Sequence, residues 1–594
     1  MSNFLLVVRH EQGNWGLNEA LDDLSRGVPD ERTDGALGSG WSYSWFSHRA
    51  RKDVVPEGGL FTGFAVHEEN EVFCFGSSGW RRNPQPSPRA ELPGCYVRAH
   101  WTTRRLTIHG DLYRMMPIFM TAENGLLLVS DSAYALVQLR RRLQLPVTMD
   151  HTVARTMLWP NSMAAQLLGS RVLASEIQYV TVGGRIEIDL SVAAARARVK
   201  YTDVHAIFAP RSDSYSSEIR SAAVRIASLV HSVAASGPEH ARLALSGGKD
   251  SRICLAAALL SPAAGRGAVF SCTNTQPHHR RDYEVVQSLA SEFGFSLGSR
   301  LPPDHETRAI RRFPKPFALW MTDQSLCYFP FKIQSYALAA AGPFSIAGLG
   351  SELYKGNYGL RTLPQLIHSL STREPGAAHA VEEIAGEALR AAGVAPQENQ
   401  SLEWHYLLLR NALHGGRFAP ATKLGLRPLQ QASLVGTAKE AGTGRFPELE
   451  RSGQIPDDLL ALLSPALAAR PFDKASKNQS PSAVIDRLRR LGGPVSVSEI
   501  SEYRMLGSAH DVLGGPLRSL ARLVPDDVAS LRMSRGDIVP VVDAAAERIE
   551  GHAPAPEWVR AARAAARTLR DPLIPVAHSR GDVGRVLAVA AVLD

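Results

Sequence analysis

The feature that most constrains the fold is a short apolar run that ends in a glycine-rich turn and leads straight into a helix-forming segment. Residues 243–252 read Leu-Ala-Leu-Ser-Gly-Gly-Lys-Asp-Ser-Arg. Paired glycines let a backbone come close to a phosphate and adopt unusual dihedral angles. The N-terminus of the following helix presents free N–H groups and a positive dipole end to an anion. The segment therefore predicts a phosphate-binding turn between a strand and a helix.

The side chains of this turn refine the prediction. Ser246 and Ser251 can donate hydroxyl hydrogens, and Lys249 and Arg252 can add positive charge. Asp250 would repel a bare phosphate, so its natural partner is a divalent cation that bridges to the phosphates. The spacings of the Walker loop and of the Rossmann fingerprint are both absent. An ordinary strand-to-helix turn remains the alternative, and a lone Gly-Gly pair would favour it.

Strands and helices alternate on either side of the turn. A helical pattern over residues 215–235 comes before it. The elements that follow are expected at residues 242–245 (strand), 251–260 (helix), 268–272 (strand), 282–293 (helix) and 344–347 (strand). Such alternation is typical of βαβ units and predicts a parallel sheet.

The segments before and after this alternating region favour different secondary structures. The first 200 residues contain short β-branched and aromatic runs divided by Gly, Pro, Asn and Asp, which indicates a β-rich domain. Two helices are expected within it, at residues 132–142 and at 150–158, the second with Asp150 as N-cap. Residues 206–214 are polar and suggest a linker. Beyond residue 360 the sequence is mainly helical.

Composition excludes several classes of protein. The 594 residues include 44% hydrophobic and 21% charged residues, ordinary values for a globular chain. We expect neither a membrane span nor a secretory leader, because no terminal apolar run is long enough. The five cysteines are widely spaced and form no CxxC pair, which favours reduced thiols in the cytoplasm over a disulfide framework or a zinc site. The net charge of +8 is small for this length and by itself does not require a nucleic-acid partner.

The turn Ser-Gly-Gly-Lys-Asp-Ser at residues 246–251 resembles the pyrophosphate loop of the ATP pyrophosphatases, most closely that of the glutamine-hydrolysing asparagine synthetase family. Enzymes of this family cleave ATP to AMP and pyrophosphate, activate a carboxylate as an acyl-adenylate and join it to an amine. Further segments that resemble the family, in the same order, are residues 110–118, 129–131, 281–286, 347–358 and, weakly, 425–429. Together they cover about residues 1–480.

The resemblance implies an α/β protein with two domains and an extension. It predicts an N-terminal Ntn-hydrolase-like αββα sandwich at residues 1–205, inactive as a glutaminase. A parallel-sheet domain similar to the adenine-nucleotide alpha-hydrolases, that is, an ATP-pyrophosphatase domain, is expected at 215–480. A helical extension is expected at 481–594.

The resemblance also implies ATP and Mg²⁺ as ligands and assigns residues to them. Asp250 and Glu352 would hold the metal ion, Glu352 in place of the family's Asp. Lys474, or else Lys477, would stabilise the charge that develops on pyrophosphate. The residues expected to bind ATP and pyrophosphate are Leu245, Ser246, Gly247, Gly248, Lys249, Asp250, Ser251, Arg252, Ser271, Gly348 and Gly350.

Two departures from the family pattern narrow the expected reaction. Glutamine-dependent members carry a nucleophilic cysteine directly after the initiator methionine, where this chain has Ser2. Branches without that cysteine include the β-lactam synthetases and the lasso-peptide cyclases. Leu349 occupies the position of a Tyr that assists deprotonation in β-lactam synthetases and of a Glu in asparagine synthetases. Because leucine cannot transfer a proton, it favours a free peptide amine as nucleophile.

The leading hypothesis is therefore ATP-dependent macrolactam or isopeptide closure of a ribosomal peptide, as in lasso-peptide cyclases. Its expected partners are a peptide or small-molecule carboxylate substrate and a precursor-processing protease, without membrane or nucleic acid. The alternatives are amide or ring formation on a small natural-product acid, a tRNA-modifying enzyme with the same loop, and a non-catalytic partner protein. The general base and the role of the C-terminal extension are left open.

Overall fold

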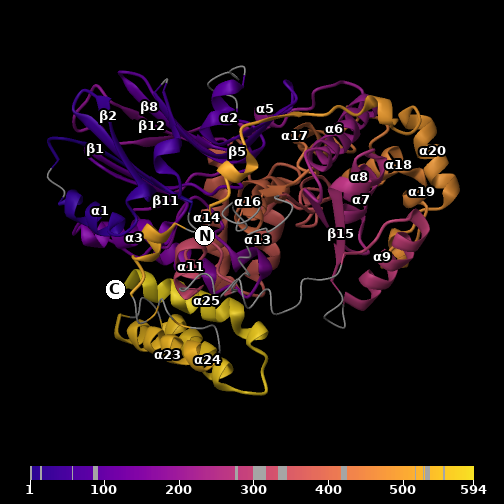
Figure 1. Ribbon diagram of the computed structural model, residues 1–594. Coiled ribbons are helices and arrows are strands. Elements are labelled where there is room, and N and C mark those ends of the chain that lie inside the picture. The colour runs from indigo at the N-terminus through magenta and orange to yellow at the C-terminus, as the bar shows by residue number, and fades with distance from the viewer. Residues whose placement is uncertain are drawn as a thin grey trace.

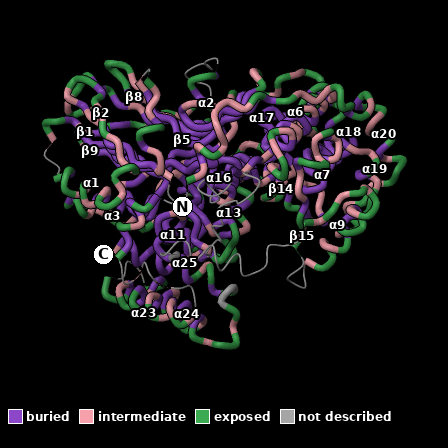
Figure 2. Tube along the Cα trace, viewed as in Figure 1, coloured by how far each residue is buried: buried purple, intermediate pink, exposed green. Residues whose placement is uncertain are grey.

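A computed structural model of the chain shows three regions (Figure 1): a β-rich N-terminal half, an α/β part beside it and a group of C-terminal helices. The buried residues run continuously through the first two regions, and exposed residues follow the outer loops and the outer faces of the helices (Figure 2). The structure describes residues 3–13, 16–56, 58–83, 91–273, 279–298, 316–331, 344–416, 424–514, 517–525, 528, 531, 535–552 and 556–593.

The first sheet of the N-terminal half has six antiparallel strands. Its central strand pairs Leu6 with Val129 on one side and with Trp45 on the other. Trp45 and its neighbour Phe46 are buried, so the aromatic run here belongs to the core. The strands, in spatial order, are β11 (Gln178–Tyr179), β9 (Phe119–Glu123), β10 (Leu126–Ser130), β1 (Phe4–His10), β3 (Trp41–Ser47) and β2 (Arg32–Gly38).

The second sheet packs its inner face against the first. Val97, with alternate residues of its strand, belongs to the common core, whereas Tyr96 points to the outer face and stacks there with Phe61 near Trp80 of α2 (Gly76–Arg82). This alternation is expected of strands whose neighbouring side chains lie on opposite faces. The strands of this second sheet, in spatial order, are β13 (Arg198–Tyr201), β12 (Gly184–Asp189), β8 (Arg105–Gly110), β7 (Gly94–Trp101), β5 (Gly59–His67), β6 (Val72–Phe75) and β18 (Arg504–Leu506). Strand β4 (Val54–Val55) pairs with β5 at the side of this path.

Two helices expected within this half are present as α3 (Ala133–Arg142) and α4 (His151–Met157). Asp150 is the N-cap of α4, because its carboxylate accepts a hydrogen bond from Val153 N at 3.0 Å. Such a cap satisfies one of the free N–H groups of the first helical turn.

The third sheet is parallel throughout and carries the turn singled out above. Helix α6 (Tyr215–Ala235) leads into it over the predicted residues. The strands, in spatial order, are β15 (Ala268–Cys272), β14 (Ala241–Leu245), β16 (Phe344–Ile346) and β17 (Leu424–Leu426). Helices α7 (Lys249–Leu260) and α9 (Arg280–Phe293) follow β14 and β15, so the predicted βαβ alternation and the α/β class are confirmed.

The C-terminal region is mainly helical but contains one strand that the sequence did not suggest. Strand β18 pairs in parallel with β6, which joins residues 504–506 to the sheet of the N-terminal half. The main helices of the region are α20 (Pro481–Leu491), α23 (Arg535–His552), α24 (Pro556–Arg570) and α25 (Val576–Leu593). Across the described stretches of the chain, no helix is both long and apolar enough to cross a membrane.

Candidate phosphate-binding site

The glycine-rich turn lies at the carboxyl end of β14 and is held by its own serines. Ser251 Oγ accepts a hydrogen bond from Ser246 N at 3.0 Å and lies 3.0 Å from Ser246 Oγ. It also donates to Ser246 O at 3.1 Å, and Ser246 Oγ accepts from Gly248 N at 3.3 Å. Leu245 is buried at the end of the strand. The turn is therefore ordered before any ligand binds.

Two acidic residues from other elements close around Gly247. Asp282, in the first turn of α9, accepts a hydrogen bond from Gly247 N at 2.9 Å, and Gly247 O accepts one from Asp473 N at 3.2 Å. A Cβ at position 247 would lie 2.8 Å from both Asp282 Oδ1 and Asp473 Cβ. Only glycine fits this approach without displacing a neighbour.

The loop after β16 comes equally close from the other side. A Cβ at Gly348 would lie 2.6 Å from the carbonyl carbon of Asp250. Gly350 has a φ of 124°, a value that side chains rarely tolerate, and faces the backbone of residues 429–430. Gly348 therefore allows this loop to pack on the start of α7, and Gly350 allows it to pack on the backbone of residues 429–430.

The two carboxylates predicted to hold a metal ion are brought together. Lys355, the last residue of α12 (Glu352–Lys355), forms an ion pair with Asp250 Oδ2, and its Nζ lies 3.7 Å from Glu352 Oε1. Glu352 Oε2 also accepts from Gly350 N at 3.0 Å. One cation thus contacts both acids, and such a donor set suits a hard divalent ion. Within the described residues, no group of three or more His, Cys, Asp or Glu side chains is arranged to hold a metal.

Lys355 is a site residue that the sequence reasoning missed. It lies three positions after Glu352, and this spacing places two side chains on the same face of a helix. That spacing was the available signal. In this structure its ammonium occupies the space between the acids, so a divalent ion there would have to displace it.

The two basic residues of the turn point away from it. Lys249 Nζ pairs with Asp457 Oδ1 at 2.5 Å, toward α18 (Ile455–Leu463). Arg252 is 1% exposed and donates to three carbonyls, those of Leu467 at 3.3 Å, Arg470 at 2.8 Å and Pro471 at 2.7 Å. Its guanidinium also lies 3.8 Å from the centre of the Phe472 ring. These contacts hold the loop that follows α19 (Pro465–Ala468), so in this structure the Arg252 guanidinium is directed at that loop and not into the turn.

That same loop carries the two candidate lysines. Asp473 connects it to Gly247, and Lys477 Nζ lies 2.8 and 3.0 Å from the Asp473 carboxylate oxygens. Lys474 is exposed, and among the described residues its side chain has no ion pair. Ser271, at the end of β15, is exposed as well and donates to Leu243 O at 3.4 Å. Of the two lysines, Lys474 is the one left available to a ligand.

Leu349 lies where the parallel-sheet domain meets the N-terminal half. A Cβ at Gly415 would lie 2.7 Å from Leu349 Cδ2 and 2.8 Å from Met115 Cε, so both side chains pack on that glycine. Nearby, Gln430 donates to Asn411 Oδ1 at 3.1 Å. On the side toward the N-terminal half, the Leu349 side chain therefore packs on Gly415 beside Met115.

Around Asp131, the described residues at the start of the N-terminal half leave only a small cavity. Asp131 Oδ2 accepts hydrogen bonds from Asn3 N at 2.7 Å and from Asn3 Nδ2 at 2.6 Å, and burial raises the pKa of Asp131 to about 7. The cavity that Asp131 lines with Gln324 and Tyr328 has a volume of about 10 Å³, which is no more than one water needs. Ser2 lies outside the described residues.

Neither cysteine of the two N-terminal sheets is suited to act as a nucleophile. Cys74 and Cys95 are both buried. Burial raises the pKa of Cys74 to about 12 and that of Cys95 well above its usual value. Thiols of this kind stay protonated and unreactive at neutral pH.

Neither the scan against protein-family models nor the search of curated proteins found a match for this chain.

Proposed function

We propose that the protein is an ATP-dependent carbon–nitrogen ligase that forms AMP and pyrophosphate. The observation that supports this most directly is the convergence at the carboxyl ends of β14 and β16: an ordered Ser-Gly-Gly turn beside Asp250 and Glu352, whose carboxylates share one cation. Open parallel sheets bind their ligands at this end of the strands. The N-terminal sandwich and the parallel sheet are, in this proposal, the Ntn-like and ATP-pyrophosphatase-like domains.

The proposed reaction has two steps. A carboxylate oxygen of the substrate attacks the α-phosphorus of ATP, the α–β phosphoanhydride bond breaks and pyrophosphate leaves. An amine then attacks the acyl carbon, the acyl–phosphate bond breaks, and AMP and a proton are released. Mg²⁺, held by Asp250 and Glu352, would neutralise phosphate charge. Lys474, on the loop beside Gly247, would stabilise the leaving pyrophosphate, because a cation fixed where charge develops lowers the barrier.

The substrate class we propose is a ribosomal peptide that is closed to a macrolactam or isopeptide, as in lasso-peptide cyclases. Its support is Leu349 itself, because leucine cannot transfer a proton, so a nucleophile that is already basic is favoured. A precursor-processing protease would supply the free amine. Use of ATP fits a protein of the cytoplasm.

Incubation with Mg·ATP and linear peptides that carry a free N-terminal amine and one internal Asp or Glu tests the proposal. We expect AMP and pyrophosphate in equal amounts, with a peptide product lighter by one water. A panel of small carboxylic acids run in parallel distinguishes the peptide from a small natural-product substrate. Hydrolysis of ATP to ADP, or no AMP with any carboxylate, would contradict the proposed reaction.

Asp250→Asn is the matched variant for this assay. It removes the charge that pairs with Lys355 while keeping the size of the side chain, and we expect AMP formation to fall by about 100-fold or more. Asp213→Asn, at a fully exposed position of the linker, should leave turnover unchanged. Equal turnover in both variants would rule out the metal role of Asp250.

A further inference from the structure

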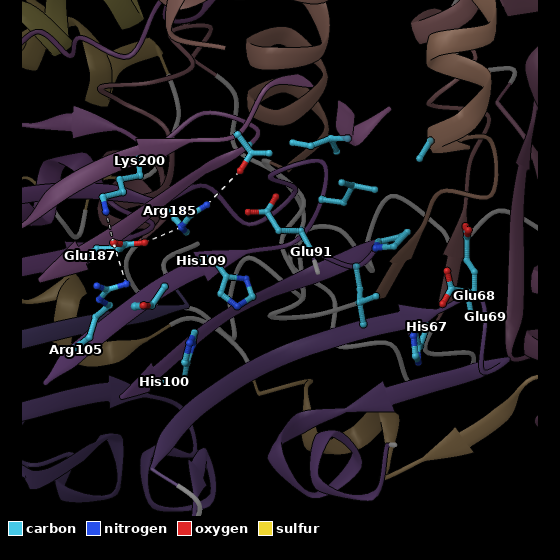
Figure 3. A pocket seen from close by; sticks show the side chains of 18 of the residues that line it. His67, Glu68, Glu69, Glu91, His100, Arg105, His109, Arg185, Glu187 and Lys200 are labelled. Atoms are coloured by element: carbon cyan, nitrogen blue, oxygen red, sulfur yellow. Dashed lines mark hydrogen bonds and ion pairs between the residues drawn. The ribbon is translucent and has the colours of Figure 1, made fainter. Parts of the chain in front are cut away.

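A much larger cavity lies outside the phosphate-binding site, on the outer face of the second sheet (Figure 3). Its volume is about 820 Å³, within the range of pockets that hold drug-sized ligands. The side chains that line it come from β7, β8, β12 and β13 and from the segments beside them, and none belongs to the phosphate-binding turn. The cavity is therefore separate from the phosphate-binding site, and the ligase reaction proposed above does not account for it.

One wall of the cavity holds a carboxylate that is only half satisfied. Glu91 Oε1 accepts a hydrogen bond at 2.9 Å from Arg114, whose side chain is fully buried. Glu91 Oε2 is buried and has no hydrogen-bond partner among the described residues, although 14% of the side chain stays exposed. Burial raises the pKa of Glu91, and Arg114 opposes that rise. A second hydrogen-bond donor on Oε2 would therefore stabilise the ionised form.

Arg114 is fixed in place for this contact. It has a φ of 54°, in the left-handed region. Its guanidinium donates to Asp111 O at 2.7 Å and also to Gly184 O. Asp111 in turn accepts hydrogen bonds from the backbone N–H of Met115 and Met116. The Glu91–Arg114 pair thus rests on a rigid turn.

Two histidines of the same wall have ring nitrogens without a hydrogen-bond partner among the described residues. His109 is 4% exposed, and burial with nearby Arg98 and Arg114 lowers its pKa to about 3, so the ring is neutral. Its Nδ1 lies 3.4 Å from Gly110 O, which places the proton on Nδ1 and leaves Nε2 as an acceptor. No described residue bonds to that Nε2, nor to Nδ1 of His100. A buried acceptor without a donor is costly, and a ligand can remove that cost.

The mouth of the cavity carries cations, in contrast to the acceptors of this wall. Glu187 is approached by three cations: Arg185 at 2.8 Å, Lys200 at 2.9 Å and Arg105 at 3.8 Å. Figure 3 shows this group at one end of the cavity, with His109 and Glu91 next to it. One carboxylate cannot neutralise three cations, so the mouth has an excess of positive charge that would attract an anionic group.

We propose that this cavity binds an amino acid or a short peptide, with its ammonium group on Glu91 Oε2 and His109 Nε2 and its carboxylate at the cations around Glu187. The acceptors on the wall need donors that a carboxylate or phosphate lacks. The cations at the mouth need an anion that a simple amine lacks. A zwitterion satisfies both, and the volume accommodates several residues.

Saturation-transfer NMR with a pool of Ala-Xaa-Ala tripeptides, with Xaa covering the common residues, tests the site. We expect binding at millimolar or lower concentration, reduced about tenfold by N-acetylation and also reduced by C-terminal amidation. A pool of free amino acids, measured in the same way, distinguishes an amino-acid site from a peptide site. No binding of either pool at millimolar concentration would overturn the proposal.

Three variants tie the signal to this cavity. Glu91→Gln and His109→Phe should each weaken binding by about tenfold. Glu19→Gln, which makes the same chemical change at an exposed position outside the cavity, should bind as the unaltered protein does. Because Glu91→Gln leaves Arg114 buried without its partner, melting curves must show that each variant is folded. His109→Phe provides the test if Glu91→Gln is not folded.

The outcome does not depend on the proposed ligase activity. Binding is measured without ATP and should persist in Asp250→Asn, which disables only the phosphate-binding site. Unchanged binding in both Glu91→Gln and His109→Phe would place the peptide elsewhere and refute the inference. Failure of the ligase assay would leave this site standing.

Discussion

Residues of the same charge in and around the phosphate-binding turn have different roles, and burial decides which. Arg252 and Lys474 both read as phosphate ligands in the sequence. Arg252 is 1% exposed and serves the backbone of a neighbouring loop, whereas Lys474 is exposed on that loop. The sequence could not distinguish these two roles. The carbonyls that Arg252 contacts belong to α19 and the loop after it, which are more than two hundred residues away in the sequence.

Replacing Arg252 by methionine should destabilise the protein. Methionine keeps most of the apolar stem but leaves three carbonyls without their charged donor. Hydrogen bonds to a charged group contribute roughly 1.5–3 kcal/mol each, and some of this loss will be offset by water. We expect a net loss of about 3 kcal/mol, seen as a melting temperature lower by several degrees.

Arg280→Met is the control for that measurement. Arg280 is 84% exposed and, within the part of the chain that the structure describes, pairs with Glu284 on its own helix. Such a surface pair contributes little, so the change should stay within about 0.5 kcal/mol. If the two variants have the same melting temperature, Arg252 does not hold the loop.

At the scale of elements, the strength of the sequence pattern decided what could be predicted. Helix α6 has a long three- and four-residue periodicity, and its predicted bounds agree with the structure. Strand β15, a compact apolar run, agrees as well. Strand β18 has only three residues and no periodicity of its own, and it forms because β6 offers it an open edge. Partners that come from distant parts of the chain leave no local signal.

In the phosphate-binding site, too, local features could be predicted and contacts between distant segments could not. The turn at residues 246–251 could be predicted, because all its parts are contiguous. Its clamp by Asp473 and the ion pair of Asp250 with Lys355 join elements more than a hundred residues apart. In the sequence, Asp282 is only part of a segment that resembles the family. Its hydrogen bond from Gly247 depends on the pairing of β14 with β15, which no local pattern predicts.

Gly247→Ala tests whether the turn needs this close approach. The added methyl group would lie 2.8 Å from Asp282 Oδ1 and from Asp473 Cβ, so one of these elements must move away. We expect Mg·ATP to bind about tenfold or more weakly by calorimetry, while stability falls by only about 1 kcal/mol.

Gly265→Ala makes the same chemical change after α7, where nothing lies within 4 Å of the added carbon. Nucleotide affinity should stay as in the unaltered protein. Equal affinities in the two variants would mean that the turn tolerates a side chain and that the clamp around Gly247 is not required for binding.

At the scale of the whole molecule, the C-terminal helices are part of the main body. Helix α25 packs on residues 329–331, and Phe331 N donates to Arg580 O at 2.8 Å. Arg585 donates to Trp159 O at 3.3 Å and to Ala164 O at 3.2 Å, and Phe329 N donates to Ala165 O at 2.9 Å. The segment around Phe329 is thus held between the N-terminal half and α25. The region expected as a separate extension therefore stabilises the join between the domains.

Two glycines of α25 allow this docking to be tested within one helix. A Cβ at Gly584 would overlap the carbonyl oxygen of Phe329, whereas a Cβ at Gly581 meets nothing within 4 Å. Alanine favours a helix over glycine by roughly 0.5–1 kcal/mol, so Gly581→Ala should raise the melting temperature slightly. Gly584→Ala gains the same propensity but must push α25 off its support, at a cost of about 1–3 kcal/mol, and should melt earlier. Limited proteolysis should then cut near α25 first in the Gly584 variant alone. A shift of the same sign in both variants would mean that α25 does not depend on its contact with Phe329, and that the C-terminal helices are held by their own packing.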